Sequence, residues 1–256
     1  MASPLQTDGV TISVVVPAKN ESGNLGKLID GIRAACTGLA PFEIIVVDDG
    51  STDDSVALVT GLMADRPGLR LLRHDSSGGQ SAAVHSGVMA ARGAIVCTLD
   101  GDGQNPPDQL PKILAPFLDG PDDPALGLVA GQRVGRQDSW SKKIASRLAN
   151  RFRGWLLKDG TRDSGCGLKA FRREAFLALP YFDHMHRFLP ALFRRDGWTV
   201  GFADVRHEPR GAGRSNYSNL QRALVGAVDL FGVAWLIRRR KKARPLPEEA
   251  GTQAGD

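Results

Sequence analysis

Two aspartates and a glutamine within five residues form the most promising group of metal ligands in the sequence. Asp100, Asp102 and Gln104 follow the apolar stretch 93–99, whose length predicts a buried strand. The glycines that alternate with them release the chain from strand geometry, so two carboxylates and an amide oxygen can converge on one hard cation. Such oxygen ligands suit Mg²⁺ or Mn²⁺ shared with a phosphate. The alternative is a hydrophilic turn, since Asp, Gly and Asn are common turn residues. We call residues 100–104 the metal loop.

Acidic residues also follow two earlier apolar runs. The runs 11–16 and 42–47 are rich in β-branched residues, which is typical of strands buried on both faces. Glu21 lies in the loop after the first run, and Asp48 and Asp49 directly follow the second. The carboxyl ends of parallel strands meet at the edge of an open sheet where ligands bind, so we expect these acids to gather beside the metal loop.

The elements that position these loops repeat in the order strand, polar loop, helix. This repetition predicts an α/β protein with a mostly parallel, twisted sheet flanked by helices. Apolar spacing predicts a further strand at 69–72 and helices at 25–35, 54–65 and 79–91. Ser51 or Thr52 is expected to cap the second of these helices. The loop that contains Gly79 lacks the P-loop and dinucleotide-binding patterns, so it is either a backbone approach to a ligand or a plain turn.

Cations are more frequent in the second half of the chain. The apolar run 126–132 ends in Arg133, and the segment 141–157 is helix-like and basic, with most of its cations expected in solvent. The loop 207–215 is cationic and rich in glycine, which suits closure over a phosphate. His184 and His186 have no third ligand nearby in the sequence, so we expect a structural role for both.

The overall composition predicts one large domain, or one domain plus an appendage. The chain has 256 residues, of which 42% are hydrophobic. Its three cysteines lack metal-binding spacing and are expected to be free thiols in a reducing compartment. No signal peptide is recognisable, which predicts a cytoplasmic protein. Six cations lie within residues 238–244, more than the whole net charge of +5. This local patch favours an anionic membrane surface over nucleic acid as the partner.

The C-terminal segment 220–237 is apolar except for three polar or charged residues, which include Arg222 and Asp229. A membrane-spanning helix needs about 20 mostly apolar residues, so the internal charges argue against spanning. We expect an interfacial amphipathic helix bordered by the cations of 238–244, and the alternative is a helix packed on the sheet. Residues 245–256 are expected to be disordered.

Four motifs together resemble a known family. They are VVVPAKNE (14–21), VVDDGSTD (46–53), GQSAAV (79–84) and DGDGQNPP (100–107). In this order they are similar to those of the family 2 inverting glycosyltransferases of GT-A fold, and most closely to polyprenyl-phosphate glycosyltransferases of the dolichol-phosphate mannose synthase type. The resemblance covers residues 11–218. It implies a tail at 1–10, a glycosyltransferase domain at 11–218, a membrane-interface helix with its basic patch at 219–244 and a disordered tail at 245–256.

The resemblance also implies roles for individual residues. The nucleotide-sugar site would comprise Pro17, Ala18, Glu21, Asp48, Asp49, Gly79 and Asp100. The divalent metal, Mg²⁺ or Mn²⁺, would be held by Asp100, Asp102 and Gln104. The acceptor phosphate would meet Arg133, Lys142, Ser146, Arg210 and Ser215. Catalysis would rest on Asp102, Arg133 and Arg210.

The implied reaction moves one sugar from GDP-mannose or a UDP-sugar to a polyprenyl phosphate of the dolichyl or undecaprenyl type. The acceptor phosphate is already largely anionic at pH 7, so positioning by arginines can replace a strong base and a single displacement with inversion suffices. The protein would then lie peripherally on the cytoplasmic face of the membrane, where a membrane-protein partner is a further expectation.

Two other functions are open at this point. Transfer to a glycan hydroxyl would need a basic carboxylate beyond the metal ligands, and Asp163 is the one candidate. A non-catalytic subunit that binds nucleotide sugars would be marked by a damaged metal loop, whereas Asp100, Asp102 and Gln104 are all present.

Overall fold

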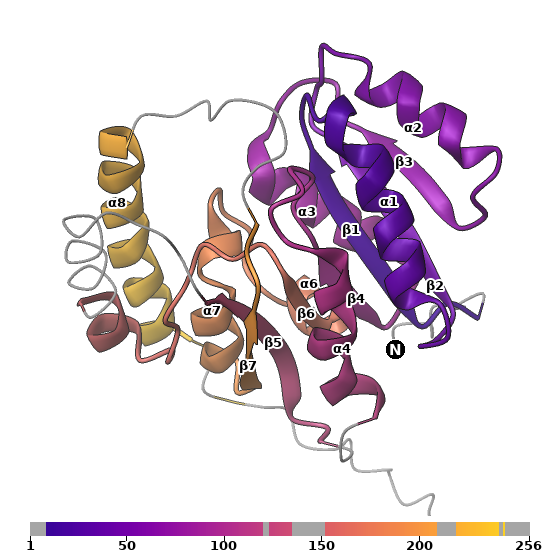
Figure 1. Cartoon of the computed structure of the whole chain (residues 1–256). Helices are drawn as coiled ribbons and strands as arrows, with labels where there is room; N and C mark the ends of the chain where they lie inside the picture. The colour runs from indigo at the N-terminus through magenta and orange to yellow at the C-terminus, as the bar shows by residue number, and fades with distance from the viewer. Residues whose placement is uncertain (1–8, 120–122, 135–151, 209–218, 241–242, 244–256) are drawn as a thin grey trace, which may run out of the picture.

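A seven-stranded sheet with helices on both faces forms the centre of the protein (Figure 1). The computed structural model describes residues 9–119, 123–134, 152–208, 219–240 and 243. The strand order is β3-β2-β1-β4-β6-β5-β7. The strands are β1 (Ile12–Ala18), β2 (Phe42–Asp48), β3 (Leu69–Arg73), β4 (Ile95–Thr98), β5 (Leu126–Arg133), β6 (Lys169–Arg172) and β7 (Thr199–Val205).

The helices divide between two hydrophobic clusters, one on each face of the sheet. One cluster includes α1 (Ser22–Cys36), α2 (Ser55–Met63) and α4 (Leu110–Leu118), which follows the short 3-10 helix η1 (Pro107–Gln109). The other includes α3 (Gly79–Ala90), α6 (Arg173–Leu177), the 3-10 helix η2 (Met185–Arg187), α7 (Leu189–Arg195) and α8 (Asn219–Arg238).

The continuous apolar runs of β1 and β2 are explained by these two clusters. Val14 and Val16 pack into the cluster of α1, while Val15 between them packs into the cluster of α3. Successive side chains of a strand point to opposite faces, so a strand that is covered on both sides is mostly apolar. Ser13 and Glu43 are polar exceptions: both are buried, and the Ser13 hydroxyl donates to Glu43 Oε1 at 2.7 Å. The expected buried strands and the mostly parallel α/β sheet are confirmed.

Two strands were not expected from the sequence. β6 runs antiparallel to its neighbours β4 and β5, and β7 pairs parallel with β5 at the sheet edge. β6 has four residues and begins and ends with the cations Lys169 and Arg172, so it carries no apolar signal of its own. Its pairing with β4 is what brings the loop before Lys169 to the metal loop: the Thr98 hydroxyl donates to the Gly167 carbonyl oxygen at 2.7 Å.

The expected cap of the helix at 54–65 is wrong. This helix, α2, begins at Ser55, and its first free amide donates to Asp53 Oδ1 at 3.0 Å. The Ser51 hydroxyl instead accepts a hydrogen bond from the Asn20 amide at 2.9 Å. Ser51 therefore joins the loops after β1 and β2 rather than capping α2. The three cysteines are buried and free, as expected.

The C-terminal helix α8 packs on the body of the protein and also leaves apolar side chains exposed, while its expected place at a membrane interface stays a prediction. Among the described side chains of this helix, Leu230, Val233 and Ala234 are buried and belong to the cluster of α3 and α7. The large apolar side chains Val228, Phe231 and Trp235 are exposed. One face thus packs on the body of the protein, and the opposite face leaves apolar surface uncovered. Within the described residues, no helix is both long enough and apolar enough to cross a bilayer.

The packing of α3 on β1 yields a prediction about stability. A Cβ at Gly87 would overlap Val15 Cγ1, because the helix lies against the strand at this point. We expect Gly87→Ala to lower the free energy of unfolding by about 1–3 kcal/mol. Gly61→Ala is the matched control: its Cβ meets nothing within 4 Å, and alanine favours helix by about 1 kcal/mol. Urea denaturation measures the stability of both variants. An equal change in the free energy of unfolding of the two variants would contradict this packing.

Candidate active site

The loops after β1, β2 and β4 are held together at one edge of the sheet. The Asp49 amide donates to the Ala18 carbonyl oxygen at 2.9 Å, and the Gly101 amide donates to the Pro17 carbonyl oxygen at 3.2 Å. Asp48 ends β2 and pairs in register with Ala18. Residues that lie far apart in the sequence therefore surround the start of the metal loop.

The carboxylate of Asp49 binds the start of α3. Asp49 Oδ1 accepts the Gly78 amide at 2.8 Å, and Oδ2 accepts the Gly79 amide at 2.9 Å. The His74 ring and the Ser77 hydroxyl complete the set, each at 2.8 Å. We call these contacts the Asp49 anchor. Asp49 and Gly79, both expected beside the nucleotide, are thus bound to each other.

The metal loop is shaped by residues from two other elements. Asp100 Oδ1 accepts a hydrogen bond from Gln80 Nε2 on α3 at 2.6 Å. A Cβ at position 167 would overlap the Asp100 carboxylate, so only glycine leaves room for that group. Gly167 precedes β6, and its contact with Asp100 follows from the pairing of β4 with β6.

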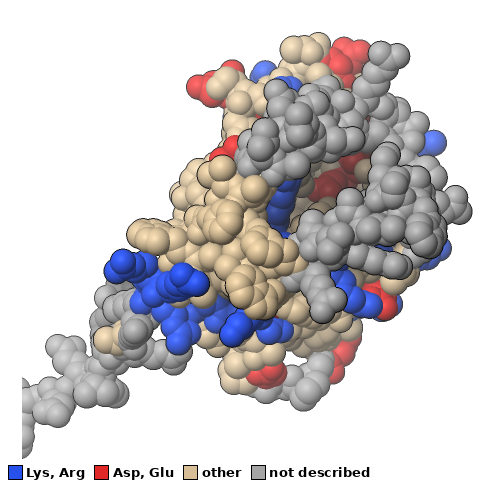
Figure 2. All heavy atoms as spheres, turned by 90° about the vertical axis from the view of Figure 1, so that its left-hand side faces the viewer, with Lys and Arg blue, Asp and Glu red and all other residues tan. Residues whose placement is uncertain are grey.

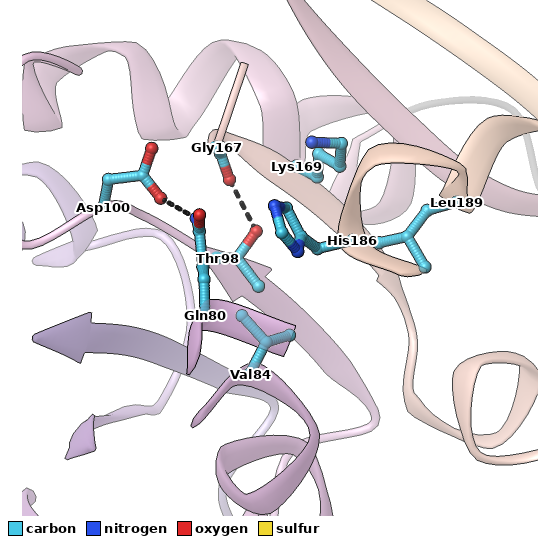
Figure 3. Close-up of a pocket in the computed structure, with 8 residues that line it drawn as sticks. All are labelled: Gln80, Val84, Thr98, Asp100, Gly167, Lys169, His186 and Leu189. Carbon is cyan, nitrogen blue, oxygen red and sulfur yellow. Dashed lines mark hydrogen bonds between the residues drawn. The ribbon is translucent and has the colours of Figure 1, made fainter. Parts of the chain in front are cut away.

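A small cavity adjoins Asp100 on its inner side (Figure 3). Its volume is about 10 Å³, the room needed for one water molecule. Lys169 lines it, and burial lowers the pKa of this amine from its ordinary value, while its Nζ donates to the Cys166 carbonyl oxygen. His186 also lines it, and its Nδ1 shares a 2.7 Å hydrogen bond with the Ser81 hydroxyl. The cavity is too small for a sugar, so a donor would have to lie outside it along the sheet edge.

The outer end of the metal loop touches the segment after β7. Asp102 Oδ1 accepts the Gln104 amide at 3.1 Å, and the Gln104 carbonyl oxygen accepts the Glu208 amide at 2.9 Å. Glu208 belongs to the cationic loop 207–215 and is the last residue described before the gap at 209–218. Glu21 lies in the loop after β1, where its Oε2 accepts a hydrogen bond from the side-chain amide of Asn24 at 2.6 Å.

Arg133 is engaged by a carboxylate. Its Nε and Nη2 donate to the two oxygens of Asp163 at 2.5 and 2.8 Å. Burial alone would raise the pKa of Asp163, but the hydrogen bonds and charge of Arg133, with the Gly165 amide, hold it below its ordinary value. A carboxylate with a lowered pKa is a weak general base, which weighs against the glycan-hydroxyl hypothesis.

Several expected residues cannot be located. Lys142, Ser146, Arg210 and Ser215 lie outside the described residues. In the basic segment, residues 152–157 are helical, and Arg153 is an exception to the expected solvated cations: it is buried and pairs with Asp159 at 2.6 Å.

Sequence reasoning missed three residues that shape the site. Gln80 holds Asp100, Gly167 makes room for it, and Lys169 lines the cavity behind it. Lys169 does carry a signal, because a lone lysine stands between apolar residues. Gln80 lies in the motif 79–84, but neither Gln80 nor Gly167 carries a signal of its contact with Asp100, since these contacts depend on how α3 and β6 pack against β4.

The Asp49 anchor yields a prediction about acid stability. Burial alone would raise the pKa of Asp49, but His74, Ser77 and the two glycine amides together lower it below 3.8. A lowered folded-state pKa stabilises the protein above pH 3.8, and this stabilisation is lost as the pH falls through the lowered value. We expect Asp49→Asn to be less stable at pH 7 by about 1–3 kcal/mol and to lose less further stability on acidification. Urea denaturation at several pH values between 7 and 3 measures both the loss at pH 7 and the further loss in acid. Stability that depends on pH equally in Asp49→Asn and in the wild type would contradict the anchor. Asp65→Asn, which removes an exposed acid, is the control.

Comparison with known proteins places the chain in a family. The model of Glycosyl transferase family 2 matches residues 13–179. Undecaprenyl-phosphate 4-deoxy-4-formamido-L-arabinose transferase of Serratia proteamaculans is 35% identical over 210 residues, which cover 81% of this chain and 63% of the relative. The protein of the same name from Sodalis glossinidius is 35% identical over 221 residues, covering 85% and 65%. The chain thus spans less than two thirds of the length of these curated relatives.

Solved structures share the fold. Glucosyl-3-phosphoglycerate synthase from Mycobacterium tuberculosis, in complex with Mn²⁺, UDP and glucosyl-3-phosphoglycerate, aligns with a TM-score of 0.66 at 22% identity, over 91% of this chain and 81% of that one. The same enzyme with Mg²⁺ and UDP aligns with a TM-score of 0.66 at 21% identity, over 91% and 80%. The expected GT-A fold is confirmed. The chain belongs to glycosyl transferase family 2.

Proposed function

We propose that this protein transfers one sugar from a nucleotide sugar to a polyprenyl phosphate of the undecaprenyl type, in a single displacement with inversion. The observation that carries the proposal is the carboxylate pair of the metal loop, which lies at the sheet edge where the loops of β1 and β2 meet. The relatives named as undecaprenyl-phosphate transferases support the acceptor. UDP with Mn²⁺ or Mg²⁺ in the similar structures supports a nucleotide-sugar donor.

The metal loop fits a divalent cation that is shared with a diphosphate. Among the described residues, no three His, Cys, Asp or Glu side chains form a complete metal site. A magnesium ion bound with a nucleotide needs only one or two carboxylates from the protein, because phosphates and water supply the rest. We assign Asp100, Asp102 and Gln104 to this ion. When bound, it would neutralise the charge that develops on the leaving diphosphate.

The nucleotide would lie along the loops after β1 and β2. Pro17, Ala18 and Glu21 line one side of this edge, and Asp48 lies opposite Ala18. Asp48 Oδ1 is buried without a hydrogen-bond partner among the described residues, so this loop has an acceptor that the protein leaves unsatisfied. In the proposal, Asp49 and Gly79 act through the anchor that shapes the base and ribose site.

The acceptor phosphate would approach from the side of the cationic loop. We assign it to Arg133, Lys142, Ser146, Arg210 and Ser215. The contact of Glu208 with Gln104 supports this assignment, because Glu208 belongs to the same cationic loop as Arg210 and lies beside the metal loop. A phosphate acceptor needs no strong base, so the proposal is compatible with Asp163 being held as the partner of Arg133.

The catalytic proposal is tested by Asp102→Asn. Loss of one metal-binding carboxylate should remove several kcal/mol of charge stabilisation, which is a fall in turnover of about 100-fold or more. The assay uses a panel of UDP- and GDP-sugars, Mn²⁺ and a short polyprenyl phosphate, with the lipid product detected by mass. Asp108→Asn, in the exposed pair with Arg206, is the control. Full activity of Asp102→Asn or in excess chelator would refute the metal assignment, and products on oligosaccharides alone would refute the acceptor.

A membrane-facing surface belongs to the same proposal. Val228, Phe231 and Trp235 of α8 are exposed, and Phe152 and Trp155, which stack at 6.0 Å, are exposed on the helical residues 152–157. Leucines of that short helix pack into the same cluster as α8. Figure 1 shows the short helix beside α8. Figure 2 shows a broad uncharged area on the side of α8, bordered by Lys and Arg. Aromatic and basic residues in this arrangement suit an anionic bilayer surface.

We therefore propose peripheral attachment to the cytoplasmic face of the membrane. Residues 11–218 would form the transferase domain and 219–244 the attachment segment, where a membrane-protein partner could also bind. This arrangement would keep the acceptor phosphate, which is fixed to the bilayer, within reach of the metal loop.

Attachment is tested with the double variant Phe231→Ser/Trp235→Ser. Each apolar side chain lost from the bilayer should cost about 1.5–3 kcal/mol, so binding to vesicles of mixed anionic and neutral lipid should weaken at least about tenfold. Binding of the wild type should also weaken with salt, because the cations contribute on the order of 1 kcal/mol each. Met89→Ser removes an equally exposed apolar side chain from α3 as the control. An equal loss of vesicle binding in the double variant and in Met89→Ser would show that α8 does not contact the membrane.

A further inference from the structure

The helix α8 carries one acidic residue, and it faces the body of the protein. Asp229 Oδ2 lies 3.2 Å from His184 Nδ1, and the side chain of Asp229 is 18% exposed. It lies between the exposed Val228 and the buried Leu230. An acid in an otherwise apolar helix costs free energy on packing unless it meets a partner, so this contact has a structural reason. The question is what it holds in place.

His184 is the residue directly before η2. It adopts a left-handed conformation with φ 64°, which is uncommon for a residue with a side chain. Its amide donates to Asp183 Oδ1 at 2.7 Å, and its carbonyl oxygen accepts the Arg187 amide at 3.1 Å. The imidazole that contacts Asp229 therefore belongs to a tightly constrained turn.

The other end of this turn touches the first turn of α3. The amide of His186 donates to Ser81 Oγ at 3.3 Å, and its ring shares the 2.7 Å hydrogen bond with the same hydroxyl. Ser81 is 1% exposed. Burial lowers the pKa of His186 well below its ordinary value, which keeps this ring neutral. Asp183 also lies against α3, with Oδ1 3.9 Å from the place of a Cβ at Gly79.

The first turn of α3 is the part of the helix that serves the site. Gly79 belongs to the Asp49 anchor, and Gln80 donates to Asp100. The η2 turn and the first turn of α3 thus connect Asp229 to Asp49 and Asp100. The first step is an approach of 3.2 Å between Asp229 and the His184 ring, which is an ion pair when the ring is protonated. The steps from the η2 turn to α3 and from α3 to the two acids are hydrogen bonds.

We propose that Asp229 is a positioning residue: through His184 it seats the η2 turn against the first turn of α3 and so supports binding of the nucleotide and metal. The inference rests on the proposed function. It makes the helix assigned to the membrane surface a support of the donor site as well. Seating α8 on the body would therefore strengthen donor binding.

The test measures nucleotide binding without a lipid acceptor. Isothermal titration calorimetry of the full chain with UDP or GDP and Mn²⁺ identifies the nucleotide that binds. Asp229→Asn should then weaken that nucleotide about fivefold or more, and in the transfer assay it should raise the donor KM while kcat changes by less than about twofold. Asp229→Glu should restore most of the affinity. Asp119→Asn removes an exposed acid far from η2 as the control.

A second variant separates positioning from general destabilisation. His184→Asn suits the left-handed backbone and removes the imidazole. If the two residues act through one contact, the double variant should bind nucleotide no more weakly than the weaker single variant. Vesicle binding of Asp229→Asn should equal that of the wild type, because the side chain faces the body.

The outcomes distinguish this inference from the function on which it rests. Additive losses in the double variant, or wild-type affinity in Asp229→Asn, would overturn the positioning role and leave the proposed function intact. Failure of the wild type to bind either nucleotide with Mn²⁺ would overturn both.

Discussion

The carboxylate of Asp49 holds the candidate site together. It accepts the first amides of α3 on both of its oxygens, where the helix dipole favours a negative charge. This contact ties the end of β2 to the start of α3. The orientation of the first helical turn then determines where Gln80 and Ser81 point, and these two side chains reach Asp100 and His186. The metal loop and the cavity behind it therefore depend on one buried acid that was expected to serve the ligand directly.

The local parts of this arrangement could be predicted from the sequence. The runs of β1 and β2 are mostly apolar because both faces are covered, and that pattern is readable without a structure. The acids after these strands were expected at one sheet edge, because the carboxyl ends of parallel strands meet there. What could not be predicted is how the side chains at that edge pair with one another. The partners of Asp49 and of Arg133 are 25 to 30 residues away, and nothing in the local pattern distinguishes a carboxylate that faces a ligand from one that faces an amide.

The helix α8 shows the same limit from another side. Its length and apolar content were compatible with a bilayer surface or with packing on the sheet, and the structure combines a packed face with an exposed one. Asp229 was an argument against spanning when only the sequence was considered. Its contact with His184 gives it a further meaning, because it connects the packed face to the body at a defined point. A single polar residue can fix the rotation of an apolar helix more sharply than its hydrophobic pattern does.

The antiparallel strand β6 has a consequence for how such a protein can diversify. β6 runs antiparallel beside β5, so the chain leaves the sheet after Arg133 and re-enters it next to the same strand at Lys169. The two ends of this excursion are fixed against each other by the hydrogen bond from the Gly131 amide to the Leu168 carbonyl oxygen at 2.9 Å. Lengthening a connection whose ends are fixed costs little entropy. Parts of the excursion could therefore be exchanged in evolution for others of different length, which would alter the accepted substrate while the metal loop, which lies outside the excursion, stayed the same.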